Sequence, residues 1–172
     1  MTIEELLIDK TKKVKEKTET ISNWLLDGSM PTDELIAFAE KSKDSEKATC
    51  IEAIEYATKI NSKIADENVF SFVIKMLTEK APRIKWESAK VIGNIAHLFP
   101  EKLSKAIDNL IINSEYDGTV VRWATAFALG EILKLKTKHN KDLLTTIEAI
   151  CNREQENGVK KKYLDAIKKA NK

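Results

Sequence analysis

Apolar residues recur along most of the chain at the spacing of an α-helix, and two of the helices that they predict carry nearly the same pattern. Segment 80–95 aligns with segment 117–132, and Trp86 falls on Trp123 at a constant step of 37 residues (123 − 86). A helical pattern that returns every roughly 30–50 residues is typical of stacked helical hairpins. The sequence therefore predicts an all-α solenoid.

Two weaker copies of the pattern flank the central pair. Cys50 falls on Trp86 at a step of 36 residues (86 − 50), and Tyr163 falls on Trp123 at a step of 40 residues (163 − 123). The step varies between helices, where solenoids accommodate insertions. The repeat therefore extends beyond the two segments in which it is most evident.

Each repeat consists of two predicted helices. The first helices, at about 82–98 and 119–135, carry two apolar stripes, which predicts neighbours on both flanks because a surface helix needs only one stripe. The second helices, at about 66–79, 101–113 and 141–152, are amphipathic. We expect the first helices to be sandwiched between repeats.

Proline and glycine positions fit this scheme. Pro82 and Pro100 fall in the first turns of predicted helices, where a missing N–H costs nothing. Gly93 and Gly130 lie inside helical patterns, where each costs about 1 kcal/mol relative to alanine. Because both occupy the same repeat position, we expect a close approach between the backbones of neighbouring helices there.

The N-terminal segment has a different pattern. Its apolar positions, among them Leu7, Val14 and Ile21, recur every seven residues and predict one long helix at about 3–26. Within a single domain, residues 1–172, we expect residues 1–29 to form a capping helix and residues 30–172 to form the repeats. The alternative is a dimerising coiled coil, but a short seam that contains threonine is weak for pairing. A cap, and with it a monomer, is favoured.

The segment Val-Arg-Trp-Ala-Thr-Ala-Phe-Ala-Leu-Gly-Glu-Ile (121–132) resembles the first helix of a HEAT or HEAT-like repeat. The resemblance covers about residues 31–172, and Pro82 and Asp117 stand where the family places a proline or an acid before this helix. It implies a right-handed α-α superhelix of the ARM type, with first helices on the convex back and second helices lining the concave face. The first and last units depart from the pattern, as terminal repeats do.

Composition narrows the class of partner. Lys and Arg total 29 and Asp and Glu total 27, so the formal net charge is only +2 and gives no general attraction to nucleic acid. No apolar run reaches membrane-spanning length, and the first residues lack the pattern of a secretory signal. We therefore expect a cytoplasmic protein without a membrane partner.

Candidate metal and redox chemistry is sparse. Cys50 and Cys151 lie on apolar faces of predicted helices that are far apart in the repeat order, which favours two buried free thiols over a disulfide. His97 and His139 have no cluster of histidine, cysteine or carboxylate at ligand spacing. The sequence therefore predicts neither a metal nor a cofactor.

Trp86 and Trp123 have a functional and a structural interpretation. HEAT-like alkylpurine DNA glycosylases, which the repeats resemble, use aromatic residues and a carboxylate on the concave face, around a basic DNA track. Both tryptophans fall instead on first helices, in a column with Cys50 and Tyr163. A column that includes a cysteine indicates packing between repeats, so we expect both tryptophans in the core.

Charged residues offer three further candidates. A C-terminal lysine cluster could contact phosphate or an acidic partner, although a solubilising cap is favoured. Arg122 is expected to pair with an acid such as Glu87 or Glu115. The aligned acids Asp108 and Glu148 are expected to be solvated rather than catalytic. The lysine cluster consists of Lys160, Lys161, Lys162, Lys168, Lys169 and Lys172.

The leading hypothesis is a non-enzymatic scaffold, without catalytic residues, that binds a protein or peptide along the concave face. Side chains that project from second helices can vary without disturbing the core, and their mixed charge favours a protein over a polyphosphate. The predicted partner-binding residues are Ser71, Lys75, Lys105, Asp108, Asn109, Thr145, Glu148 and Asn152. The alternatives are a DNA-binding protein similar to the HEAT-like glycosylases and an accessory subunit or lyase-like chaperone.

Overall fold

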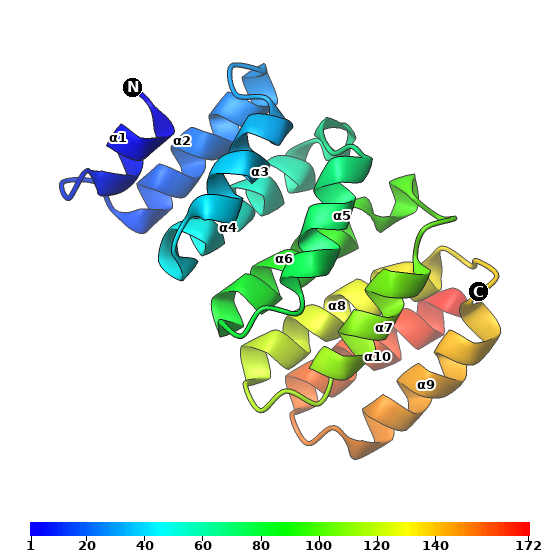
Figure 1. The fold of residues 1–172 in the computed structure, drawn as a ribbon. Helices are drawn as coiled ribbons and strands as arrows, with labels where there is room; N and C mark the ends of the chain where they lie inside the picture. The colour runs from blue at the N-terminus through cyan, green and yellow to red at the C-terminus, as the bar shows by residue number, and fades with distance from the viewer.

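The computed structural model describes residues 1–172, and it contains ten α-helices, two short 3-10 helices and no β-strand. The chain is a stack of helical hairpins, as the repeat predicts (Figure 1). The α-helices are α1 (Ile3–Ile8), α2 (Val14–Asp27), α3 (Thr32–Lys41), α4 (Asp44–Ile60), α5 (Glu67–Met76), α6 (Pro82–Ile95), α7 (Ser104–Asn113), α8 (Thr119–Lys134), α9 (Asn140–Arg153) and α10 (Asn157–Ala170). The 3-10 helices η1 (Ser62–Ile64) and η2 (Ala96–Leu98) follow α4 and α6.

The helices form two layers (Figure 1). In the first layer α2, α4, α6, α8 and α10 lie side by side, and each packs against the next. In the second layer α3, α5, α7 and α9 cover one side of the first, and each packs against the first-layer helix that follows it in the chain. Neighbouring helices contact each other much more extensively in the first layer than in the second. The helices α4, α6 and α8 therefore have first-layer neighbours on both flanks, as the two apolar stripes of α6 and α8 predict.

Most predicted helix limits lie within a few residues of the observed ones, but Pro100 is an exception. Pro82 is in the first turn of α6, as predicted. Pro100 instead lies in a turn, and α7 begins only at Ser104. The turn is closed by a hydrogen bond from the Lys102 N–H to the Phe99 carbonyl (3.0 Å). The prediction for Pro100 is wrong because the chain completes this turn before the helix begins.

The prediction of one long helix at 3–26 is also wrong, because residues 9–13 separate α1 from α2. The Asp9 carboxylate accepts hydrogen bonds from the backbone N–H (2.8 Å) and the hydroxyl (2.6 Å) of Thr11. Short polar side chains that bond to the nearby backbone in this way compete with helix formation. The helix α1 has a capping box formed by Thr2 and Glu5, and at the start of α2 the Glu16 carboxylate accepts a hydrogen bond from the Lys13 N–H at 2.7 Å.

The helix α2 continues the first layer instead of standing outside the repeats. It packs against α4, and α3 packs against α4 from the second layer (Figure 1). Together α2 and α3 take the place of a repeat, although their sequence lacks the repeat pattern. The short helix α1 lies at the N-terminal end, where the Lys17 ammonium donates to the Leu7 carbonyl at 2.7 Å. That this end acts as a cap stays a prediction.

One continuous cluster of buried apolar side chains runs through the stack from α1 to α10. Two glycines on first-layer helices leave no room for a side chain. A Cβ atom on Gly93 would lie 2.3 Å from the Phe127 ring, and one on Gly130 would lie 2.9 Å from the Ala166 Cβ. The facing helix therefore approaches closely at Gly130, where the Lys162 carbonyl would also lie 3.9 Å from the added Cβ atom, whereas at Gly93 the close neighbour is a side-chain ring and not the backbone.

Polar contacts join each repeat to the next at a separation close to the repeat length. The Asn94 amide on α6 donates to the Glu55 carbonyl on α4 at 3.2 Å. The Asn113 amide on α7 donates to the Leu77 carbonyl at the end of α5 at 3.0 Å. Hydrogen bonds are directional whereas apolar burial is not, so these bonds help to set the register between hairpins.

Candidate functional site

The predicted partner-binding residues all lie on second-layer helices, but the structure does not bring all of them together. We call the exposed side of α3, α5, α7 and α9 the second-helix face. Only Ser71, Lys75, Lys105 and Asn109 line a common groove, between α5 and α7. The exposed members of the set are Ser71 and Lys75 on α5, Lys105 and Asp108 on α7, and Thr145, Glu148 and Asn152 on α9. The α9 residues therefore belong to a different part of the same face.

Asn109 differs from the others because it is buried. Its amide nitrogen donates to the Ile74 carbonyl on α5 at 3.2 Å, so the side chain links the two walls of the groove. The expectation that Asn109 is freely offered to a partner is wrong. A buried amide needs hydrogen-bond partners, and the end of α5 supplies one.

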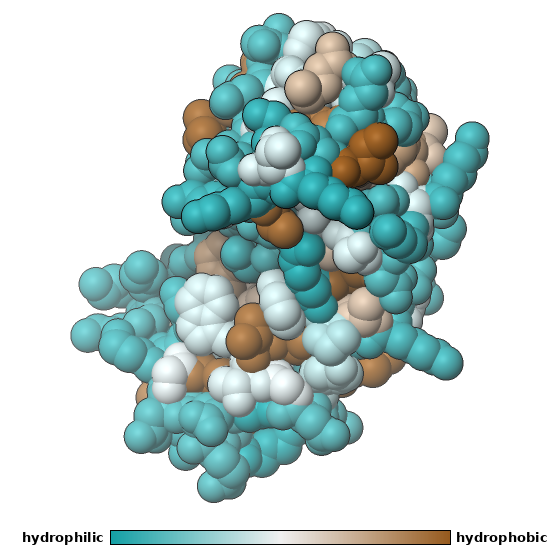
Figure 2. Space-filling model, turned by 90° about the vertical axis from the view of Figure 1, so that its left-hand side faces the viewer, coloured by the Kyte–Doolittle hydropathy of each residue, from teal (hydrophilic) through white to brown (hydrophobic).

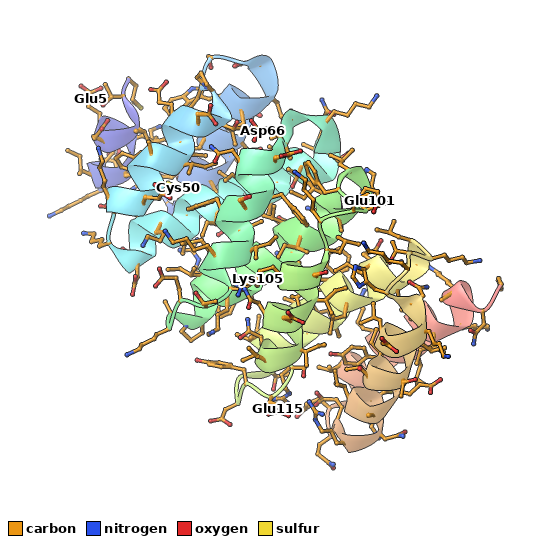
Figure 3. All side chains as sticks on the ribbon, turned by 45° about the vertical axis from the view of Figure 1, so that its right-hand side comes forward. Glu5, Cys50, Asp66, Glu101, Lys105 and Glu115 are labelled. Atoms are coloured by element: carbon orange, nitrogen blue, oxygen red, sulfur yellow. The ribbon has the colours of Figure 1, made fainter.

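The groove between α5 and α7 has a volume of about 550 Å³. Figure 3 shows Lys105 at the boundary between these two helices. The groove exists because neighbouring second-layer helices pack less closely than the first-layer helices beneath them. Its lining consists of Glu67, Phe70, Ser71, Ile74, Lys75 and Thr78 from the α5 side, and Lys102, Lys105 and Asn109 from the α7 side.

The floor of the groove is apolar and fixed. Phe70 is 2 % exposed and stacks on Phe99, with ring centroids 4.8 Å apart. Ile74, one turn further along α5, is 9 % exposed. Because these side chains belong to the continuous core, the floor is positioned before any partner arrives.

The rim of the groove is basic. Lys75 and Lys105 are exposed, and neither forms an ion pair within the chain. Lys102 pairs with Glu67 at 2.6 Å, but both side chains are more than half exposed, so solvent weakens the pair. Three lysines against one glutamate give the groove a local excess of positive charge that the net charge of the chain does not reveal.

Five groove residues were absent from the prediction, namely Glu67, Phe70, Ile74, Thr78 and Lys102. The sequence did contain a signal for two of them. Phe70 and Ile74 are separated by one helical turn and lie beside the main apolar stripe of α5, which runs through Val69 and Val73. A second apolar row on a second-layer helix indicates an apolar floor next to the exposed face.

The tryptophans lie in the first layer and are not part of this groove. Trp86 is partly buried, and its Nε1 donates to the Glu87 carboxylate at 2.8 Å. Trp123 is 37 % exposed; it stacks on Phe127 (ring centroids 6.3 Å apart) and lies under the Lys162 ammonium at 4.8 Å. The prediction of a core position is wrong for Trp123, because the neighbouring helix α10 places the side chain of Lys162 over the ring and leaves the ring partly exposed.

Arg122 forms an ion pair with a carboxylate, as predicted in kind, but the partner is Glu154 at the end of α9 rather than Glu87 or Glu115. Its Nε lies 3.1 Å from Glu154 Oε2, and its Nη1 donates to the Tyr116 carbonyl at 3.0 Å. Burial by itself would raise the pKa of the Glu154 carboxyl. Hydrogen bonds from Arg122 and from the backbone N–H groups of Gln155 and Glu156 instead hold this pKa below its usual range. The arginine therefore links the end of α9 to the turn that precedes α8.

The cysteines and the C-terminal lysines also have structural surroundings. Cys50 and Cys151 are buried free thiols, as predicted. Burial raises the pKa of Cys50 to about 12 and also raises the pKa of Cys151.

In the C-terminal lysine cluster, Lys161 pairs with Asp165 at 2.9 Å, and Lys162 covers the ring of Trp123. Part of the cluster is therefore engaged within the chain.

In the view of Figure 2, hydrophilic residues surround smaller groups of apolar ones. None of the helices combines the length and the apolar character needed to cross a membrane. No group of three or more histidine, cysteine, aspartate or glutamate residues is placed to hold a metal ion.

Comparison with known proteins identifies the class of fold. No protein-family model and no curated protein matches the chain. A designed armadillo repeat protein in complex with the peptide (KR)4 superposes with a TM-score of 0.74 at 13 % identity, over 98 % of this chain and 86 % of that chain. The complex of CpcE and CpcF of phycocyanin lyase from Nostoc sp. PCC7120 superposes with a TM-score of 0.72 at 17 % identity, over 95 % of this chain and 94 % of that chain.

A third solved structure, of computationally designed armadillo repeat proteins for modular peptide recognition, gives a TM-score of 0.69 at 17 % identity, over 97 % of this chain and 80 % of that chain. At such low identities the similarity establishes the fold and not the activity. The chain is a helical-repeat protein with an armadillo- or HEAT-like solenoid fold.

Proposed function

We propose that the protein is a non-enzymatic scaffold that binds a protein or peptide segment on its second-helix face. The observation that carries the proposal is the groove between α5 and α7, which combines a buried apolar floor with exposed, unpaired polar side chains. Specific binding sites in proteins commonly have this combination of an apolar base and a few polar groups at the edge.

The architecture supports the same function. Side chains on the second-helix face are held by a core that they do not help to form, so they can be selected for a partner without loss of stability. Two of the similar structures are designed armadillo repeat proteins, one solved with a bound peptide and one designed for peptide recognition. They support the proposal only in showing that a solenoid of this shape can present a peptide-binding surface.

Affinity capture from the native cell, followed by mass spectrometry, tests the proposal. The face variant carries Lys75→Glu, Asp108→Lys and Glu148→Lys, which reverse three exposed charges on α5, α7 and α9. A matched control carries Lys59→Glu, Glu19→Lys and Asp165→Lys, which make the same charge changes on the first layer. We expect the face variant to lose partners that the wild-type protein and the control retain.

The circular dichroism spectrum and thermal unfolding of each variant establish that it is folded before capture is compared. A folded face variant that retains the same partners as the wild-type protein would contradict the proposal. Loss of the same partners from the control alone would place the binding surface on the first layer instead.

A further inference from the structure

We infer that the groove between α5 and α7 selects an acidic peptide segment that carries one apolar side chain. The inference rests on the proposed function and specifies the chemistry of its ligand. Three features of the groove support it: the unpaired charge on its rim, the fixed apolar floor, and the distance between its two walls.

The rim supplies the charge selectivity. Lys75 and Lys105 project from opposite walls and have no carboxylate partner within the chain. Lys102 has a partner in Glu67, but this ion pair is exposed to solvent and therefore weak. An incoming carboxylate can bind Lys102 beside Glu67, or in place of Glu67, at little cost in free energy. A segment with negative side chains on both sides of the groove therefore meets complementary charge, whereas a basic segment meets like charge from all three lysines.

The floor supplies the second part of the specificity. Phe70 and Ile74 are almost fully buried, and their exposed edges form the base of a hollow of about 550 Å³. That volume accommodates a side chain such as leucine, which loses its contact with water on entry. Because Phe70 stacks on Phe99 within the core, the floor does not have to rearrange.

The geometry of packed helices sets the spacing of the ligand. Axes of closely packed helices lie about 8–10 Å apart, and α5 and α7 pack less closely than the first-layer helices do. An extended chain advances about 3.3 Å per residue, so a segment needs at least about three residues to cross from one wall to the other. The matching ligand places its acidic residues on either side of an apolar residue within this short span.

The surroundings of the groove favour a peptide over a nucleic acid. Asp108 on α7 and Glu148 on α9 are exposed on the same face, and they would repel a phosphate backbone that continued beyond the groove. Proteins that bind single-stranded nucleic acid without sequence preference stack the bases on aromatic side chains. The aromatic ring in this groove, Phe70, is already stacked on Phe99 and is 2 % exposed.

Fluorescence anisotropy with synthetic peptides tests the inference on the full chain. The probe is a labelled peptide of alternating glutamate and serine with one central leucine. Two matched peptides replace every glutamate by lysine, or the leucine by serine. We expect the acidic probe to bind at least about tenfold more tightly than either comparison peptide, since a factor of ten needs only one buried side chain or a few ion pairs. Raising the salt concentration should weaken its binding.

Variants of the protein locate the binding. The groove variant carries Lys75→Glu, Lys102→Glu and Lys105→Glu, and the control variant carries Lys10→Glu, Lys59→Glu and Lys168→Glu, all at exposed positions. Both change the net charge by the same amount, so the control removes the effect of overall charge. We expect the groove variant to lose binding of the acidic probe about tenfold or more and to gain affinity for the lysine peptide, while the control binds as the wild-type protein does.

Equal binding of the acidic and lysine peptides, or loss of binding in the control alone, would overturn the inference. Tighter binding of a single-stranded oligonucleotide than of the acidic probe through the same lysines would also overturn it. These outcomes leave the proposed function standing if the face variant still loses its cellular partners. The proposed function itself fails only if those partners are retained.

Discussion

Glu87 on α6 is a buried carboxylate with incomplete hydrogen bonding. It is 4 % exposed; its Oε1 accepts the hydrogen bond from Trp86, its Oε2 has no partner, and the Lys90 ammonium lies 3.6 Å away. Burial, assisted by the charges of Glu52 and Glu55, raises the pKa of Glu87 more than Lys90 and Trp86 lower it. The ionised form is therefore disfavoured in the folded protein.

This arrangement gives a pH-dependent prediction for Glu87→Gln. A carboxyl whose pKa is raised by folding contributes to stability below its unfolded pKa, and the contribution is lost as the pH rises through the folded pKa. The amide carries no charge, so the variant should be more stable than the wild-type protein at pH 8. The difference in the free energy of unfolding should shrink as the pH falls toward 4. Urea unfolding at several pH values measures it.

The variant Glu115→Gln removes the same charge from an exposed position and controls for the change in net charge. A stability difference between Glu87→Gln and the wild-type protein that is constant from pH 4 to pH 8 would show that protonation of Glu87 is not linked to folding.

Arg122 shows how far residue-level prediction extends. The position of this arginine before Trp123 indicated a structural ion pair, and the pair exists. The acid could not be identified, because Glu154 lies 32 residues further along the chain and approaches only when the final two helices pack. The sequence predicts the kind of bond that a buried cation needs, but the fold decides which carboxylate supplies it.

At the scale of the helices, glycine at the contact between α6 and α8 is explained by the facing ring. Gly93 costs helix stability, yet a Cβ atom there would meet Phe127 at 2.3 Å. The ring fills the space that the missing side chain leaves. The glycine therefore lowers the helix propensity of α6 but allows α6 and α8 to pack closely.

We predict that Gly93→Ala lowers the free energy of unfolding by about 1–2 kcal/mol, because overpacking outweighs the gain in helix propensity. In a Phe127→Ala background the same substitution should be neutral or stabilising, since the ring is absent. Chemical denaturation of the four proteins in this double-mutant cycle measures the coupling. Gly158→Ala, where an added Cβ meets nothing within 4 Å, is the matched control and should be stabilising.

The N-terminal helices show where helix prediction failed for a local reason. The seven-residue spacing of apolar residues continued across positions 9–13, but the bonds from Thr11 to Asp9 end the helix there. Val14, which the spacing placed in an apolar seam, is instead exposed near the start of α2. Periodicity alone cannot detect such a break, because polar side chains that compete for the backbone do not alter the apolar pattern.

At the scale of the whole molecule, the core is shared by every repeat, and Cys50 is completely buried within it. Burial raises the pKa of this thiol to about 12, so neither access nor the thiolate form is available in the folded state. Cys151 lies near the C-terminal end of the stack and is 6 % exposed. The two thiols therefore report on opening of the interior and of the end, respectively.

We predict that Cys50 in a Cys151→Ala protein reacts with iodoacetamide at pH 8 about a thousandfold or more slowly than in the unfolded chain, because labelling requires loss of the common core. Cys151 in a Cys50→Ala protein should react faster, through local opening of the terminal helices. Mass spectrometry against time measures both rates. Rapid labelling of Cys50 in native buffer would show that the N-terminal repeats open independently.

The sequence by itself determined the all-helical fold and the alternation of first helices with two apolar stripes and amphipathic second helices. It also located, at Gly93 and Gly130, two positions where neighbouring helices leave no room for a side chain. These properties are encoded locally, since helical periodicity and the absence of a side chain are features of the residues themselves. Only the tertiary structure decided that α5 and α7 leave a groove, that Lys75, Lys102 and Lys105 surround it, and that Trp123 is partly exposed. Such features depend on the lateral distance between helices of different repeats, which is set by the packing of residues far apart in the chain.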